Sequence, residues 1–359
     1  MAFTDTSGLT TAQLETIASA ALDFYVKGDA FNQSIQDKPL LAALRGKQNT
    51  FAGGKGKISL PVVGDYMDSS AGFFSGFSGS DAVSFQNPAT LKRATYSYYE
   101  IHAGLTVSFS ELKADGITIA DSAFGEKTTQ ASGRDVTNLT NLLDYKLSSM
   151  SEGWARKMNE MLWRDGTQDA KLSPGILAYI TDSAATGIVG GINKATFSWW
   201  RNRVNLGITA GSDNLTTALR KEVRQLTRFG GKPNLILCGS AFLDALEKEV
   251  AAKALYSQSG VAGTKNIASP SVTLTGIGTF VYDPTLDDLQ GKIGGAIDYS
   301  KRCYFIDTDA IGLYVMDGED NKVHAPARPE TNYALYRSMT WTGGTAAKRL
   351  NSCGVVSIA

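Results

Sequence analysis

The sequence has little of what redox, metal or covalent chemistry uses. Only three cysteines, Cys238, Cys303 and Cys353, and two histidines occur among 359 residues. The cysteines lie far apart and form no CxxC pair, so the sequence indicates neither a disulfide framework nor a zinc ribbon. The histidines form no cluster with the spacing of metal ligands. We therefore expect no metal and no cofactor, and free thiols suit a reducing cytoplasm.

An excess of charge of one sign and long apolar runs are also lacking. Thirty-five lysines and arginines balance 35 aspartates and glutamates, whereas a dedicated nucleic-acid binder carries a clear positive excess. No stretch of eighteen apolar residues occurs, and the first residues show no basic segment followed by an apolar run. We expect neither a membrane span nor a signal peptide. Contact with DNA is expected to be weak and non-specific.

What is present is a globular composition, with 43% hydrophobic and 19% charged residues. This is enough apolar surface to build a sizeable core. Near the start, apolar residues repeat at helical spacing between Thr10 and Leu22, which predicts a short helix. A polar stretch then leads to an apolar segment at Pro39. The pattern indicates an arm that carries one short helix.

Two strands are indicated in the first third of the chain. The segment Ile58–Val63 is strand-like, and Pro61 marks it as an edge strand because proline cannot donate to a ladder. The clearest β pattern is Tyr99–Phe109, where apolar and polar residues alternate. A glycine-rich stretch before the first strand lacks the spacing of a phosphate-binding loop, so we interpret it as a hinge. Its glycines are Gly53, Gly54 and Gly56.

A glycine- and serine-rich segment lies between these two strands and carries three phenylalanines. They are Phe73, Phe74 and Phe77. A long two-stranded excursion buries too little apolar surface to be stable alone, and exposed aromatic side chains at its tip would form an adhesive patch. We expect a neighbouring subunit to cover it.

The rest of the chain predicts an α+β fold. Apolar side chains form a helical stripe from about residue 127 to 164, which predicts one long helix that ends near Asp165 and Gly166. Two shorter helices are expected at 215–229 and after Ser240. No repeated βαβ run occurs. Strands are expected at Pro233–Leu237, Val272–Leu274, Thr279–Tyr282, Cys303–Ile306, Leu313–Met316, Tyr333–Trp341 and Gly354–Ile358.

A few residues invite a chemical interpretation. Cys238 stands at the end of an apolar strand, but the Gly-x-Ser-x-Gly pattern of a nucleophile elbow is missing. His102 and His324 could each act only as a single base, and the acidic residues 317–321 lack the ligand spacing of a calcium loop. No nucleophile, base and orienting group come together, so we predict no catalytic residue and no enzyme. A hydrolase stays an alternative.

The adjacent tryptophans Trp199 and Trp200 precede Arg201. Aromatic and basic residues together can stack nucleic-acid bases. Paired tryptophans between a strand and a helix more commonly anchor packing, and we expect that role here.

Read in order, these features resemble the major capsid (head) proteins of tailed bacteriophages, whose fold is shared with encapsulins. Gly191–Asn202 is the most specific stretch, and the resemblance covers nearly the whole chain. The segments that carry it are Ser110–Lys113, Gly116–Asp121, Trp163–Thr167, Pro174–Leu177, Gly191–Asn202, Pro233–Leu237 and Tyr282–Pro284.

The resemblance implies a division of the chain into four parts. Residues 1–52 would form an N-terminal arm, and 53–98 an extended β-hairpin loop that lies across a neighbouring subunit. Residues 99–167 and 331–359 would form a peripheral domain with the long helix, about 127–164, as its spine. Residues 168–330 would form an axial α+β domain. The sequence shows no scaffold-like coiled coil before the arm and no identifiable crosslinking pair.

The function implied is that of a shell protein, which assembles with itself into hexamers and pentamers around a double-stranded DNA genome. Separate scaffolding, portal and decoration proteins would be partners, and no membrane would be involved. The protein would reside in the virion after assembly in the cytoplasm of a host bacterium. An encapsulin-like compartment, and an adhesive binding module built on the β excursion, stay open beside the hydrolase.

Overall fold

The computed structural model describes residues 36–53, 56–64, 74, 76–82, 85, 91–108, 133–211, 214–252, 271–274, 276–293, 297–324 and 334–359. The chain forms two compact units. The first unit contains Met1–Gln36, Ile101–Arg156 and Gly318–Trp341, and the second contains Asp37–Glu100, Lys157–Asp317 and Thr342–Ala359. The four-part division of the sequence analysis stays a prediction.

A mixed six-stranded sheet is the centre of the second unit. Its strand order is β7-β15-β11-β8-β10-β9. β8 is parallel to β10 and antiparallel to β11, while β15 is parallel to β7 and antiparallel to β11. Every residue of β11 is buried, as its continuous apolar run indicates for a central strand. The strands are β7 Arg203–Ile208, β8 Leu235–Cys238, β9 Ser271–Leu274, β10 Gly278–Tyr282, β11 Arg302–Ile306 and β15 Gly354–Ile358.

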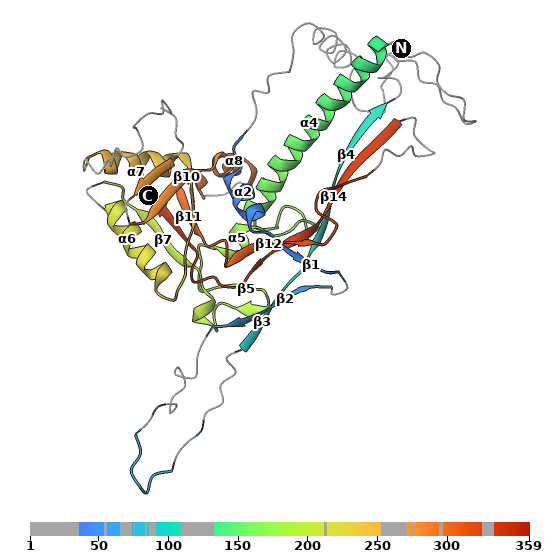
Figure 1. The fold of residues 1–359 in the computed structure, drawn as a ribbon. Helices are drawn as coiled ribbons and strands as arrows, with labels where there is room; N and C mark the ends of the chain where they lie inside the picture. Colours follow the sequence, from blue (N-terminus) through green and yellow to red (C-terminus); the bar gives the residue numbers. More distant parts are fainter. Residues whose placement is uncertain are drawn as a thin grey trace. The chain divides into compact units, whose positions relative to one another are not determined.

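Helices pack on this sheet and close its core. α6 (Asn214–Thr227) and α7 (Ser240–Ala252) lie beside the strands in Figure 1, and α8 (Pro284–Ile293) follows β10. The apolar stripes of α6 and α7 meet the sheet in one cluster, whose members include Leu219, Phe242, Phe280 and Phe305. The first backbone amides of α6 are satisfied by Glu249 of α7, which accepts hydrogen bonds from Leu215 N at 3.1 Å and Thr216 N at 2.9 Å.

Shorter elements complete the second unit. β12 pairs in parallel with β1 and antiparallel with the C-terminal part of β14. A small hairpin, β5–β6, precedes the tryptophan pair. The bounds are α2 Pro39–Gly46, β1 Asn49–Phe51, α5 Ile176–Tyr179, β5 Ile188–Val189, β6 Ile192–Asn193, η2 Ser198–Trp200, η3 Tyr299–Lys301, β12 Ile311–Met316 and β14 Ala334–Ala347. Only the part of β14 from Thr342 onward belongs to the second unit.

The first unit contains most of a long strand and most of a long helix. β4 (Tyr99–Ser108) alternates half-buried and exposed residues from Tyr99 to Thr106, as its period-two sequence predicts. α4 (Gly133–Trp163) has 31 residues, about 46 Å at the α-helical rise. In the same unit Trp154 Nε1 donates to Asn321 Oδ1 at 3.0 Å, beside the short β13 (Lys322–Val323).

Most expected elements are present. The long helix ends at Trp163, next to the expected Asp165–Gly166 stop, and Gly166 adopts φ +92°. All seven expected strands of the second half occur, and the acidic residues 317–321 form a turn. β7 and α8 were not foreseen, because β7 mixes polar and apolar residues and α8 is only ten residues long. The arm helix expected at Thr10–Leu22 lies outside the described residues.

Candidate assembly surface

A two-stranded sheet supports the phenylalanine-bearing segment. β2 (Ile58–Val63) pairs antiparallel with β3 (Leu91–Tyr96), from Ile58 opposite Tyr96 to Val63 opposite Leu91. Within the described residues β2 pairs with β3 alone, so Pro61 lies in an edge strand as predicted. We call residues 64–91, which connect and adjoin these strands, the loop.

The described aromatic side chains of the loop are not covered by their own chain. Phe74 is 98% exposed, Phe77 73% and Phe85 92%. Phe73 lies outside the described residues. Asp81 is also exposed and accepts a hydrogen bond from Ser78 N at 2.8 Å, which holds a turn after Phe77. Three phenylalanines exposed to this extent on one segment are an adhesive surface that a folded monomer does not use.

The expected hinge glycines are only partly described. Gly53 and Gly56 are exposed, and a β-carbon on Gly56 would contact nothing within 4 Å. Neither adopts a positive φ, so their conformation does not require glycine here. Gly54 lies outside the described residues, and the hinge role stays a prediction.

Aromatic side chains hold both roots of the loop. At the end of β2, a β-carbon on Gly64 would overlap the indole ring of Trp199. At the start of β3, the Lys92 ammonium lies 5.1 Å from the ring centroid of Phe197. Phe197 and Trp199 are themselves in contact, with ring centroids 5.6 Å apart. These two rings form an aromatic platform that packs against Gly64 at the start of the loop and Lys92 just after its end.

A buried lysine holds the segment that carries this platform. Lys194 is fully buried, and its Nζ donates to Tyr179 O and Thr181 Oγ1 at 3.1 Å and to Asn202 Oδ1 at 3.2 Å. Burial lowers the pKa of Lys194 to about 8. Trp200 is buried, and its Nε1 donates to Val189 O at 3.0 Å. The stretch Gly191–Asn202 is therefore anchored in the interior by Lys194 and Trp200, which is the packing role expected for the tryptophan pair.

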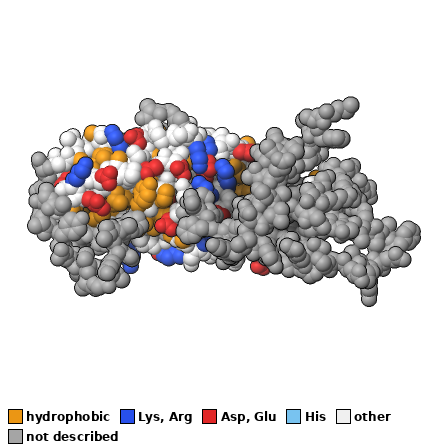
Figure 2. Space-filling model, turned by 90° about the horizontal axis from the view of Figure 1, so that it is seen from above, with side chains coloured by type: hydrophobic (Ala, Val, Ile, Leu, Met, Phe, Trp, Pro, Cys, Tyr) orange, Lys and Arg blue, Asp and Glu red, His pale blue; other side chains and the backbone are white. Residues whose placement is uncertain are grey.

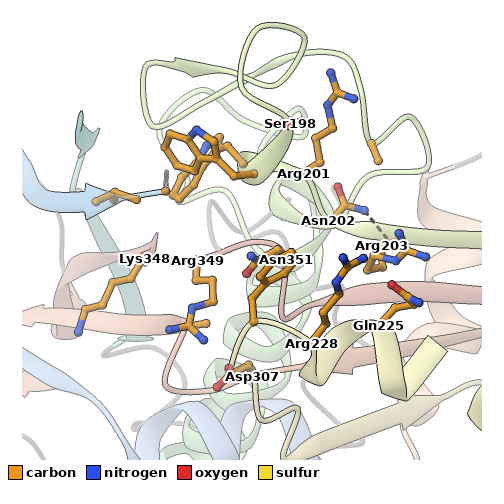
Figure 3. A pocket seen from close by; sticks show the side chains of 18 of the residues that line it. Ser198, Arg201, Asn202, Arg203, Gln225, Arg228, Asp307, Lys348, Arg349 and Asn351 are labelled. Atoms are coloured by element: carbon orange, nitrogen blue, oxygen red, sulfur yellow. Dashed lines mark hydrogen bonds between the residues drawn. The ribbon is translucent and has the colours of Figure 1, made fainter. Parts of the chain in front are cut away.

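A groove of about 1220 Å³ lies beside the roots of the loop. Its walls come from β2, the tryptophan segment, the end of α6 and the turn after β14 (Figure 3). Its apolar lining includes Pro61, Val63, Trp199 and Phe229, and Phe229 is 66% exposed. The charged residues of the lining are Arg201, Arg203, Arg228, Lys232, Lys348, Arg349, Asp307 and Asp309.

Positive charge dominates this groove. Its six cations exceed its two carboxylates by four. Asp309 pairs with Lys47 at 2.7 Å, and Arg203 pairs with Glu222 at 3.4 Å. Within the described part of the chain, no ion pair is formed by Arg228 or Arg349. The groove therefore carries a local positive excess although the chain as a whole is neutral. On the face shown in Figure 2, by contrast, charges of both signs are interspersed with hydrophobic side chains.

The structure does not bring the chemically suggestive residues together. Cys238 is fully buried, and burial raises its pKa to about 12, so the thiolate needed by a nucleophile is strongly disfavoured. His102 is exposed on β4, and His324 Nε2 is hydrogen-bonded to Thr340 Oγ1 at 2.8 Å. No group of three metal-ligating side chains occurs among the described residues. None of their helices is long and apolar enough to cross a bilayer.

No protein-family model and no curated protein matches the chain. Solved structures do. The capsid protein of Cyanophage A-1(L) is 17% identical, with a TM-score of 0.58, over 92% of this chain and 95% of that one. This is the phage capsid fold. Two further capsid structures match over a similar share of the chain. The capsid of a native GTA particle is 16% identical, with a TM-score of 0.55, over 95% of this chain and 98% of that one. The capsid of Myoviridae Phage XM1 is 13% identical, with a TM-score of 0.54, over 93% of this chain and 96% of that one.

Within the capsid fold, the sequence pointed to the loop and its phenylalanines but not to the groove. The groove cations come from three stretches that are separated in sequence: the tryptophan segment with the start of β7, the residues just after α6, and the turn after β14. The one local signal was the tryptophan pair followed by Arg201, since Trp199 and Arg201 both line the groove. No pattern in the sequence joins them to the cations after α6 and after β14.

Proposed function

We propose that this chain is the major capsid protein of a tailed phage, which assembles with itself into the icosahedral shell that encloses the double-stranded DNA genome. The capsid fold supports this over nearly the whole chain. The observation that carries it within the molecule is the set of uncovered phenylalanines on the loop. A monomeric protein gains nothing from such a surface, whereas a shell subunit can bury it against a neighbour.

Many weak contacts repeated by symmetry account for assembly. Fully burying one phenylalanine contributes roughly 1.5–3 kcal/mol, so the loop offers each interface several kcal/mol before the entropy of association is subtracted. A closed shell repeats that contact in every subunit, and the subunits hold one another jointly. In this proposal Phe73, Phe74 and Phe77 anchor the loop on the next subunit, and Gly53, Gly54 and Gly56 let it adjust.

The partners follow from the same proposal. Hexamers and pentamers of this chain form the shell in the cytoplasm of a host bacterium, and the mature protein resides in the virion. Scaffolding, portal and decoration functions belong to separate proteins. The balanced charge of the chain fits weak, non-specific contact with the packaged DNA. No residue is assigned a catalytic role.

Electron microscopy of the purified recombinant protein after size-exclusion chromatography tests this function, with and without a candidate scaffolding protein. Closed shells or tubes are the expected result. A strictly monomeric protein under all conditions would contradict it. If shells form, their content separates a phage head from an encapsulin-like compartment, because packaged DNA indicates the former and an enclosed enzyme the latter.

A further inference from the structure

We propose that the basic groove is the receptor for the loop of a second copy of this chain. The proposal rests on the proposed shell function and deepens it, because it names the surface on which the loop docks. The groove comprises residues of β2, the tryptophan segment, the end of α6 and the turn after β14.

Charge complementarity supports this pairing. The loop, residues 64–91, contains three aspartates, Asp65, Asp68 and Asp81, and no lysine or arginine. The groove has an excess of four positive charges. Opposite potentials of this kind steer association and set the register of two surfaces. The chain as a whole is neutral, so this separation of charge between two segments is a local feature.

The apolar parts of the two surfaces match as well. The loop presents Phe74, Phe77 and Phe85, and the groove presents the exposed ring of Phe229 beside Trp199. Arg228 lies 5.3 Å from the Phe229 centroid, so its guanidinium can face an acidic side chain while the ring meets an aromatic one. A volume of about 1220 Å³ exceeds that of a typical small-molecule site and suits a peptide segment with large side chains.

The two surfaces belong to different parts of one chain, so their pairing is heterologous. Such head-to-tail contacts build rings when the rotation closes. Both surfaces are open in the single chain, where Phe77 remains 73% and Phe229 66% exposed. One subunit therefore offers a loop to the next and a groove to the previous one, as the ring of a capsomer requires.

Charge reversal in the full-length protein tests the pairing. Arg228→Glu with Arg349→Glu removes the groove charge, and Asp68→Lys with Asp81→Lys reverses the loop. Each pair is expected to lower the yield of closed shells about tenfold or more. In the combination of all four, the new glutamates of the groove can pair with the new lysines of the loop, so part of the lost assembly is expected to return. Arg220→Glu with Lys221→Glu, the same charge change elsewhere on α6, should assemble like the wild type. A groove variant that assembles normally, or a combination no better than its parts, overturns the proposal.

Cysteine cross-linking tests the same contact directly. The double variant Phe77→Cys with Phe229→Cys is expected to give a ladder of disulfide-linked oligomers under mild oxidation. A mixture of two chains that each carry one of these cysteines should give dimers only. Phe77→Cys paired with Arg220→Cys is the matched control and should give neither. Absence of cross-links beyond this control overturns the proposal.

These outcomes are separable from the proposed function. If the wild type never forms shells, the shell function fails, but the mixed single-cysteine chains still test the loop–groove contact because one interface suffices. If groove-reversed subunits form shells at wild-type yield and only their DNA content falls, the groove binds nucleic acid and the proposal is overturned while the shell function stands.

Discussion

Gly64 lies against the indole of Trp199 so closely that a β-carbon at Gly64 would overlap the ring. Gly64 is the first residue after β2, and Trp199 belongs to the segment braced by Lys194 and Trp200. The start of the loop is thereby tied to the interior of the second unit through one close approach.

Gly64→Ala is expected to lower the free energy of unfolding by about 1–3 kcal/mol, because the added methyl group must displace the Trp199 ring. Trp199→Leu in the same chain should recover part of the loss, since the smaller side chain leaves room. Thermal and denaturant unfolding measure both effects. Gly76→Ala, where a β-carbon meets nothing within 4 Å, is the matched control. Equal effects at the two glycines would show that Trp199 is not the cause.

Replacement of Phe73, Phe74 and Phe77 by serine should block or strongly reduce shell formation and leave the monomer folded. The described members of this set contribute almost nothing to the monomer core, since Phe74 is 98% and Phe77 73% exposed. Circular dichroism reports the fold, and electron microscopy reports the shells. Phe242→Ser, in the core cluster, is the contrasting variant and should unfold the protein. Normal shells from the triple variant would remove the loop from the mechanism of assembly.

Lys194 should make stability rise with pH in an alkaline window. Burial lowers its pKa to about 8 in the folded protein, against about 10.4 in an unfolded chain. Between these values the unfolded chain holds a proton that the folded protein has lost, so raising the pH favours folding. The expected gain relative to Lys194→Met is up to about 3 kcal/mol across this range.

Denaturant unfolding of the wild type and Lys194→Met from pH 7.5 to 10.5 measures this gain as a difference, which cancels the titration of the tyrosines, the cysteines and the other lysines. Lys221→Met, at an exposed position on α6, is the matched control and should show no such trend. A pH-independent difference between wild type and Lys194→Met would mean that the Lys194 amine keeps its ordinary pKa.

Arg302 and Asp182 form a bidentate salt bridge, in which the guanidinium donates two hydrogen bonds of 2.6 Å to the carboxylate. The Arg302 side chain is only 9% exposed, so Asp182→Asn should leave a poorly compensated buried guanidinium and cost about 3 kcal/mol. Glu319→Gln breaks the Lys322 pair of the same length at an exposed site and should cost less than about 1 kcal/mol. If the two variants lose similar amounts of unfolding free energy, burial does not explain why the Arg302–Asp182 pair matters more.

Cys238 should react with iodoacetamide only after unfolding. Its side chain is fully buried and burial raises its pKa to about 12, so both access and thiolate are lacking at neutral pH. Mass spectrometry after native and denatured labelling measures this. The same result is expected for Cys303 and Cys353, which are also fully buried. Rapid native labelling at Cys238 would revive the hydrolase hypothesis.

The sequence predicted elements wherever burial follows a simple period. The alternation along β4 and the apolar run of β11 each show one environment repeated along one element, and each was located from its pattern. α4 was located from the apolar stripe of its sequence. β7 was missed because its burial follows no simple alternation, and it gains its place by pairing with β15, some 150 residues further along the chain. Strand pairing at such a distance leaves no mark within the strand itself.

The candidate assembly surface was likewise only partly predictable from the sequence. Composition alone determined that the loop carries phenylalanines and acidic residues without a single lysine or arginine, and that the chain as a whole is neutral. Only the tertiary structure decided that Gly64 meets Trp199 and that Arg228 and Arg349 line one groove. Side chains more than a hundred residues apart become neighbours through packing, and periodicity reports the environment along one element but not which elements meet.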